Sequence, residues 1–151
     1  MILLSRRSLL AIAAVVDIAL HARPLPVSAK ILSARHTLPP RHLETMLQAL
    51  VRAGILKGVR GPRGGYEIAR ERRRITAGDI VRAAMASTGE DSLPPIPESR
   101  LVDEVVGPVV KHAGAAFLAE LDAITVEELC RRAEDGNVFS DEHQPVVDFT
   151  I

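Results

Sequence analysis

Polar side chains suited to contact with DNA bases stand close together in one short segment of the sequence. Arg41, His42 and Glu44 come at the start of a predicted helix, and Thr45 and Gln48 follow on its polar side. An arginine can donate two hydrogen bonds to guanine, and a carboxylate can accept one from the amino group of cytosine. This set predicts base reading in double-stranded DNA, although a solvated helix face explains Thr45 and Gln48 equally well.

A second basic group follows on a predicted β-hairpin. Residues 55–60 favour a strand, residues 66–69 favour its return, and the glycines between them permit positive φ. Arg60 and Arg63 lie on this hairpin, where arginines can enter the narrow minor groove. A solvated, glycine-rich hairpin is the alternative. A basic hairpin directly after two short helices nevertheless favours a winged helix that binds nucleic acid.

Three predicted helices must position these side chains. The first shows apolar residues at the helical period and is expected to bury a face made of Leu9, Ile12, Ala13, Val16 and Ala19. The prolines of residues 24–26 end it. Ser28 is the predicted N-cap of a second helix over residues 28–34, with Ile31 and Leu32 inward, and it joins the candidate DNA contacts.

The third predicted helix carries the base-reading set. It runs over residues 41–53 and ends at Gly54, a residue type favoured just past a helix end. Its buried side consists of Leu43, Met46, Leu47 and Leu50. Two short helices joined by a tight turn, the second with outward polar residues, form a helix-turn-helix pattern.

The first residues also resemble an export signal. SRRSLL at 5–10 precedes an apolar stretch, as in a twin-arginine signal. Asp17 interrupts that stretch, and Leu20 stands where a cleavage site needs a small residue. We therefore expect a first helix and a cytoplasmic protein, and no apolar run reaches the ~20 residues of a membrane span.

The charge is divided between the two parts of the sequence. Residues 1–87 contain fifteen Lys and Arg against five Asp and Glu, whereas residues 88–151 contain four against fourteen. The excess cations are nearly all arginine, whose planar fork of donors suits phosphate. The basic part predicts a polyanionic partner, and the acidic part must have another task.

No grouping of residues predicts catalysis. The sequence shows no Ser/His/Asp set, phosphate loop or paired carboxylates, and its five histidines lack metal-ligand spacing, so we expect neither an enzyme nor a metal site. The single cysteine, Cys130, is most simply a packing residue. Arg131 and Arg132 beside it offer the alternative of a redox switch, because cations lower a thiol pKa.

Residues 39–69, PPRHLETMLQALVRAGILKGVRGPRGGYEIA, resemble the signature of the Rrf2 family of bacterial transcriptional regulators. The glycine-rich hairpin motif is the most specific part, and looser similarity extends over residues 5–134. The resemblance implies a winged helix that binds DNA as a two-fold dimer through a long C-terminal helix. It also implies that Arg41, His42 and Glu44 face the major groove and that Arg60 enters the minor groove. The family often has tyrosine at the position of His42, which implies a different operator preference.

One departure from the family concerns its sensor. Cluster-binding members carry three cysteines between the helix after the wing and the dimerisation helix, but residues 87–97 contain none. An iron–sulfur cluster needs such ligands at close spacing. We therefore expect a member that lacks the cluster cysteines and uses no cofactor. The signal is then an unidentified ligand, a partner protein, a thiol switch or none.

We predict that the acidic part, residues 88–151, forms the dimer contact. A linker over residues 88–98 precedes dimerisation helices over residues 99–136 and a C-terminal tail over residues 137–151. A helical stripe in this part comprises Leu101, Val105, Val109, Ala113, Ala116 and Leu121. Gly107-Pro108 predicts a kink or a break. An intramolecular bundle is the alternative use of the stripe.

These observations predict a mainly α-helical protein with a small β-hairpin, in which residues 1–87 form a winged helix-turn-helix domain. The expected function is a homodimeric regulator, a repressor, that binds a pseudo-palindromic operator in double-stranded DNA. The alternative is a winged-helix module that binds another protein without specific DNA reading.

Overall fold

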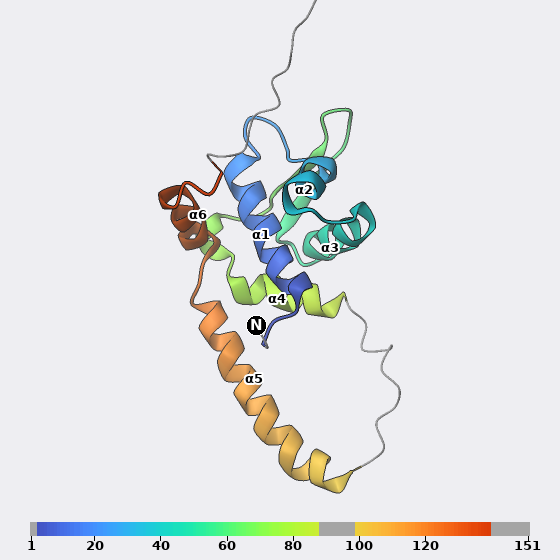
Figure 1. The fold of residues 1–151 in the computed structure, drawn as a ribbon, viewed down its shortest axis with the longest axis vertical. Coiled ribbons are helices and arrows are strands. Elements are labelled where there is room, and N and C mark those ends of the chain that lie inside the picture. The colour runs from blue at the N-terminus through green and yellow to red at the C-terminus, as the bar shows by residue number, and fades with distance from the viewer. Residues whose placement is uncertain (1–2, 88–98, 140–151) are drawn as a thin grey trace, which may run out of the picture.

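A computed structural model of the chain describes residues 3–87 and 99–139, and Figure 1 shows its fold. The elements in chain order are α1 (Arg6–His21), α2 (Ala29–His36), α3 (Pro40–Arg52), β1 (Leu56–Val59), β2 (Gly65–Ile68), η1 (Arg72–Arg74), α4 (Ala77–Ala86), η3 (Val102–Val106), α5 (Gly107–Asp122) and α6 (Val126–Asp135). The predicted fold class is confirmed, because the described residues are mainly helical and pair two strands in one hairpin. None of these helices is long and apolar enough to cross a membrane.

One hydrogen bond and one glycine conformation explain where α2 begins and where α3 ends. The Ser28 hydroxyl accepts from the backbone N–H of Ile31 at 3.2 Å, which makes Ser28 the N-cap of α2 as expected. Gly54 follows the end of α3 with φ of +73°, a conformation that glycine adopts without strain. These two residues fix where the two helices of the helix-turn-helix begin and end.

The hairpin pairs β1 and β2 antiparallel, with Leu56 opposite Ile68 and Val59 opposite Gly65. Its loop turns at Gly61, whose φ is +116°. Both strands lie within one residue of their predicted bounds at each end, and β1 stops just before Arg60. The sequence therefore located the wing correctly.

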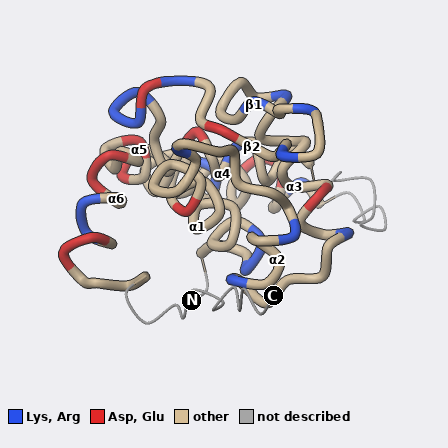
Figure 2. The backbone as a smooth tube through the Cα atoms, turned by 90° about the horizontal axis from the view of Figure 1, so that it is seen from above, with Lys and Arg blue, Asp and Glu red and all other residues tan. Residues whose placement is uncertain are grey.

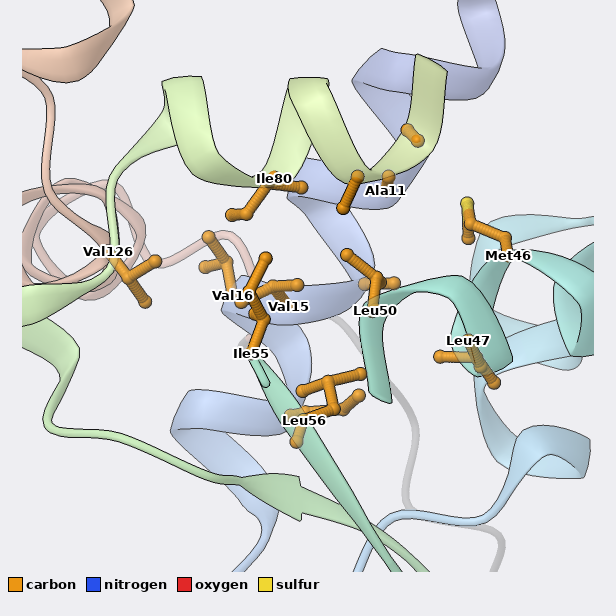
Figure 3. Packing of buried hydrophobic residues seen from close by; sticks show 14 of the residues in the cluster. Ala11, Val15, Val16, Met46, Leu47, Leu50, Ile55, Leu56, Ile80 and Val126 are labelled. Carbon is orange, nitrogen blue, oxygen red and sulfur yellow. The ribbon is translucent and has the colours of Figure 1, made fainter. Parts of the chain in front are cut away.

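The core is aliphatic and forms around α1. Figure 3 shows Val15 and Val16 of α1 among side chains from α3, α4 and the chain entering β1, with Val126 of α6 alongside. The largest fully buried side chains are Ile18, Leu32, Leu43, Leu47, Leu50, Ile55, Leu56, Ile75, Ile80, Val15, Val81 and Val126. Because Val126 and Cys130 are buried in this cluster, α6 is part of the core that the first four helices build.

Two predicted inward positions are wrong. Leu9 is 38% exposed, while Ala11, Ala14 and Ile18 on another face of α1 are completely buried. The reason is that α1 packs against α2, β2, α4 and α6, so its buried arc is too wide for one apolar stripe to mark. Ile31 is 44% exposed, because the short helix α2 buries only Leu32.

The long helix continues through Gly107-Pro108 by widening one turn. Pro108 has no N–H to donate, and the N–H of Gly107 donates to the carbonyl oxygen of Val102, five residues back. A Cβ at Gly107 would lie 2.8 Å from that oxygen, so glycine suits this position. The expected kink thus takes the form of the π-helical segment η3, directly before α5.

Helix α5 extends away from the core as an arm (Figure 1). None of its residues is buried, so the structure does not show the intramolecular bundle that was the alternative for its apolar stripe. The linker over residues 88–98 and the tail from residue 140 onward lie outside the described residues.

A buried carboxylate connects α1 to α2. Asp17 is fully buried and accepts hydrogen bonds from Arg35 at 2.5 Å, from His36 Nε2 at 2.8 Å and from His21 Nδ1 at 2.9 Å. Burial alone raises the pKa of Asp17, but the hydrogen bond from His36 and the charges of Arg35 and His21 outweigh it. The pKa of Asp17 therefore lies below its ordinary value.

We expect Asp17→Asn to lower the free energy of unfolding by about 1–3 kcal/mol, because its partners lose a buried anion. Since the folded-state pKa is lowered, the contribution of Asp17 is present above the unfolded pKa of about 4 and is lost as pH falls through the folded value. Denaturant titrations of both proteins from pH 7 to pH 3 test this. The exposed Asp135→Asn variant is the control. A difference between wild type and Asp17→Asn that stays constant with pH would contradict the assignment.

Candidate nucleic-acid interface

The exposed face of α3 carries the predicted base-reading residues. Leu43, Met46, Leu47 and Leu50 are buried, and every residue of the polar set is exposed: Arg41, His42, Glu44, Thr45 and Gln48. The separation follows from the helical period, which places the apolar residues on the core side. The structure therefore brings the set together on one solvent-facing surface.

The side chains of this face differ in how free they are to bind. Within the described part of the chain, Arg41 forms no ion pair, and the first turn of α3 contains no acidic residue. The helix N-terminus adds a partial positive charge there. The Thr45 hydroxyl donates to the carbonyl oxygen of Arg41 at 3.1 Å, so it is already engaged on its own helix. Arg41 is thus the best-placed donor for a phosphate or a guanine.

The wing is attached to the helix-turn-helix by a backbone bridge. The N–H of Val27 donates to the carbonyl oxygen of Tyr66 at 3.1 Å, and the N–H of Tyr66 donates to that of Val27 at 2.8 Å. A Cβ at Gly65 would overlap the carbonyl oxygen of Val27, and one at Gly64 would overlap that of Val59. The two glycines of the wing motif are therefore required because backbone approaches backbone closely at both positions.

The bridge places Ser28 and Glu44 near the base of the wing. Ser28 directly follows Val27, and its hydroxyl caps α2. Burial raises the pKa of Tyr66, and the charge of Glu44 raises it further. Glu44 therefore lies within electrostatic reach of the wing and adds one negative charge to the otherwise cationic surface.

The hairpin arginines are exposed and free of ion pairs among the described residues. This holds for Arg60 and Arg63, whereas Lys57 on β1 pairs with Glu67 on β2 at 3.1 Å. Because these guanidinium groups form no internal ion pair, they can bind phosphate oxygens without first breaking one.

The charge division seen in the sequence is partly kept in space. Figure 2 shows Lys and Arg on the hairpin and around α2 and α3, while most Asp and Glu lie over α5 and α6, where η1 and α6 also carry arginines. A nucleic acid that approaches α3 and the wing therefore meets cations first, and the acidic helices lie away from it.

Cys130 has the environment of a packing residue. It is buried in the core, and burial raises the pKa of its thiol more than neighbouring Arg72 lowers it. The thiolate that reacts with oxidants is scarce at neutral pH under these conditions. The geometry supports the packing role over the redox switch.

Comparisons with known proteins agree with this geometry. The family model Rrf2, described as an iron-dependent transcriptional regulator, matches residues 4–132. The chain belongs to the Rrf2 family. An HTH-type transcriptional regulator of Synechocystis, slr0846, is 34% identical over 131 residues, covering 83% of this chain and 86% of that protein. The IscR of Vibrio atlanticus is 36% identical over 73 residues, which are 48% of this chain and 42% of that one.

Two solved structures of this kind have the same fold. The structure of T. potens IscR has a TM-score of 0.63 at 33% identity and covers 88% of this chain and 89% of its own. CymR of B. subtilis, named as the global cysteine regulator, has a TM-score of 0.64 at 26% identity and covers 87% and 98%. This Rrf2 protein is a transcriptional regulator and not an enzyme.

The residues present do not fit an iron centre of the cysteine-ligated kind. The sequence has one cysteine, and its sulfur is enclosed in the core beside Arg72. Among the described residues, no group of three His, Cys, Asp or Glu could hold a metal ion.

Sequence reasoning found the exposed residues of this Rrf2 protein and missed the contacts that position them. The Val27–Tyr66 bridge joins segments about forty positions apart, and only the adjacent glycines hinted at a close approach. In the sequence, Asp17 only interrupts an apolar stretch. A single acidic residue in such a stretch, however, also indicates a carboxylate that is buried together with a paired cation or donor.

We expect Gly65→Ala to lower the free energy of unfolding by about 1–3 kcal/mol and to weaken DNA binding, because the added Cβ forces the wing away from Val27. Gly58→Ala is the matched control on β1, where nothing lies within 4 Å of an added Cβ. Denaturant titration and a DNA-binding assay measure both effects. Equal behaviour of the two variants would contradict the role of the bridge.

Proposed function

We propose that this Rrf2 protein is a cytoplasmic, homodimeric repressor that reads a pseudo-palindromic operator through α3 and its wing. The observation that carries the proposal is the exposed set Arg41, His42 and Glu44 on α3, together with exposed hairpin arginines, Arg60 and Arg63, that form no ion pair among the described residues. Its relatives are named as transcriptional regulators, and this supports the same proposal.

In the proposed complex α3 enters the major groove. An α-helix fits this groove, and its N-terminal residues come closest to the base edges. Arg41 then donates to guanine, Glu44 accepts from cytosine or repels phosphate at wrong sites, and His42 contacts the neighbouring base pair. Ser28 at the start of α2 contacts the phosphate backbone, while Thr45 and Gln48 make secondary contacts.

The wing supplies the second contact. Arg60 enters the adjacent minor groove, where the negative potential is strongest when the groove is narrow, and Arg63 neutralises phosphate. Phosphate neutralisation releases counterions, so affinity falls steeply with salt. A protein that occupies both grooves at a promoter excludes the polymerase, which is the proposed route to repression.

A second copy of the chain is the proposed occupant of the apolar stripe on the arm. Six large apolar residues of η3 and α5 are exposed at helical spacing, up to 67% for Val109: Leu101, Val102, Val105, Val106, Val109 and Val110. A soluble protein rarely leaves such a stripe uncovered. The residues 113–116, Ala-Gly-Ala-Ala, allow two helices to approach closely. Two-fold pairing of the arms would present two copies of α3 to two half-sites.

Capture of fragmented genomic DNA by the purified protein at moderate salt, followed by sequencing, tests the function. Enrichment of a few sites that share a two-fold motif would support the proposal, and increased transcription of the adjacent genes after gene deletion would support repression. Uniform recovery of all fragments would contradict base reading. No recovery would favour the alternative, a winged-helix module that binds an acidic protein.

Arg60→Ala should reduce affinity for a captured site by about tenfold, because it removes one charge-assisted contact of about 1–3 kcal/mol. Arg132→Ala removes an equally exposed arginine on α6, away from the proposed interface, and should change affinity less than twofold. Fluorescence anisotropy titrations at fixed salt measure both. Unchanged affinity of Arg60→Ala would remove the wing from the interface.

Val109→Glu should convert the dimer into a monomer, because two charges would be brought together in the apolar contact. Val138→Glu is the control, a similarly exposed valine outside the stripe. Sedimentation velocity gives the oligomeric state of each. A wild-type protein that sediments as a monomer, or a Val109→Glu variant that remains dimeric, would contradict the proposed dimer contact.

A further inference from the structure

The arm has few attachments to the rest of the molecule, and they are concentrated at its C-terminal end. No residue of α5 is buried, and its packing on the core is against α4 (Figure 1). Directly after α5, the N–H of Ala77 donates to the carbonyl oxygen of Ile124 and the N–H of Val126 donates to that of Ile75, both at 2.8 Å. This pair of backbone bonds holds one point of the junction but leaves the direction of the helix to side chains.

At this end of α5 the apolar side chains of Phe117, Leu118 and Leu121 are half-buried, and one exposed polar contact further constrains the angle of the helix. Arg82 of α4 donates to both carboxylate oxygens of Asp122, the last residue of α5, at 2.6 and 2.7 Å. This fork-to-fork geometry constrains the angle between the groups as well as their distance. The hydrogen bonds from Arg82 also hold the pKa of Asp122 below its ordinary value.

A glycine at a third position leaves space for this contact. Gly78 lies one turn before Arg82 on α4, and a Cβ there would overlap Oδ1 of Asp122. The carboxylate therefore lies directly against the backbone of α4, a position that only glycine permits. We call Gly78, Arg82 and Asp122 the arm clamp.

We propose that the arm clamp sets the distance between the two DNA half-sites that the dimer accepts. This inference rests on the proposed two-fold DNA binding and assigns its spacing specificity to three positioning residues. The clamp acts through the arm, since none of the three residues lies on the surface formed by α3 and the wing.

Because the arm is long, a small change in its angle at the clamp produces a large displacement of the apolar stripe. At 1.5 Å per residue, Val105 in the apolar stripe lies about 25 Å along the helix from Asp122. A tilt of about 10° at the clamp therefore moves the stripe by about 4 Å, which is on the order of one base-pair step of 3.4 Å. The backbone bonds at the junction do not prevent such a tilt, because both are made by residues that follow the C-terminal end of α5.

Duplexes that carry two half-sites of a captured operator, separated by the natural spacer or by one base pair more or less, provide the test. We expect wild type to prefer one spacing by at least tenfold. Arg82→Ala and Asp122→Ala should reduce this preference to less than threefold, with unchanged dimerisation and unchanged affinity for a single half-site. The double variant should lose no more than either single variant.

Gly78→Ala provides an independent route to the same outcome. It keeps both charged groups and favours the helix, and its Cβ displaces the Asp122 side chain and crowds Nη1 of Arg82, with no backbone atom in the way. It should therefore lose the spacing preference while it retains the thermal stability of wild type. Arg132→Ala, which removes the Arg132–Glu128 pair within α6, is the control and should keep the preference.

The outcomes separate the two proposals. If wild type does not prefer two half-sites over one, the proposed dimeric reading of DNA fails. If wild type prefers one spacing and Arg82→Ala, Asp122→Ala and Gly78→Ala all keep that preference, the proposed role of the arm clamp is overturned and the dimeric reading stands.

Discussion

The close approach of two backbone segments, at Val27 and Gly65, is the constraint on which the DNA-facing surface depends. The core packs β1 against α3 through Ile55 and Leu56, and this contact adds a link from the hairpin to the start of α2. With it, the strand that carries the wing is held beside the start of the helix-turn-helix by two hydrogen bonds. The requirement for glycine at position 65 follows from this contact alone, and the same contact makes one rigid surface from residues some forty positions apart.

Two further contacts extend this rigidity in different directions. Asp17 holds α2 to the central helix α1 through a buried carboxylate with three donors. Arg82 and Asp122 hold the arm to α4. The surface proposed to read bases and the stripe proposed to form the dimer are thus connected by the apolar core together with one buried and one exposed polar contact.

The sequence predicted the exposed parts of the molecule better than the buried ones. Helix α3 was assigned correctly because its two faces differ sharply in polarity, and the wing because its glycines and arginines form a specific motif. The buried face of α1 was assigned only in part: Val16 is buried and Ile12 and Ala19 pack against the core, but Leu9 is exposed, because a central helix surrounded by four elements has no single stripe. Asp17, the Val27 bridge and the Arg82–Asp122 pair could not be predicted, since each joins residues between 18 and 40 positions apart and depends on tertiary packing.

The central claim is that α3 and the wing of each subunit act together on one half-site. Hydroxyl-radical and methylation-protection footprints of a captured operator, recorded with wild type and Arg60→Ala, test it most directly. The account predicts two guanine protections in the major groove related by a two-fold axis, each flanked by a protected minor-groove segment that disappears in Arg60→Ala. A footprint without two-fold symmetry, or one in which Arg60→Ala keeps its minor-groove protection, would contradict the account.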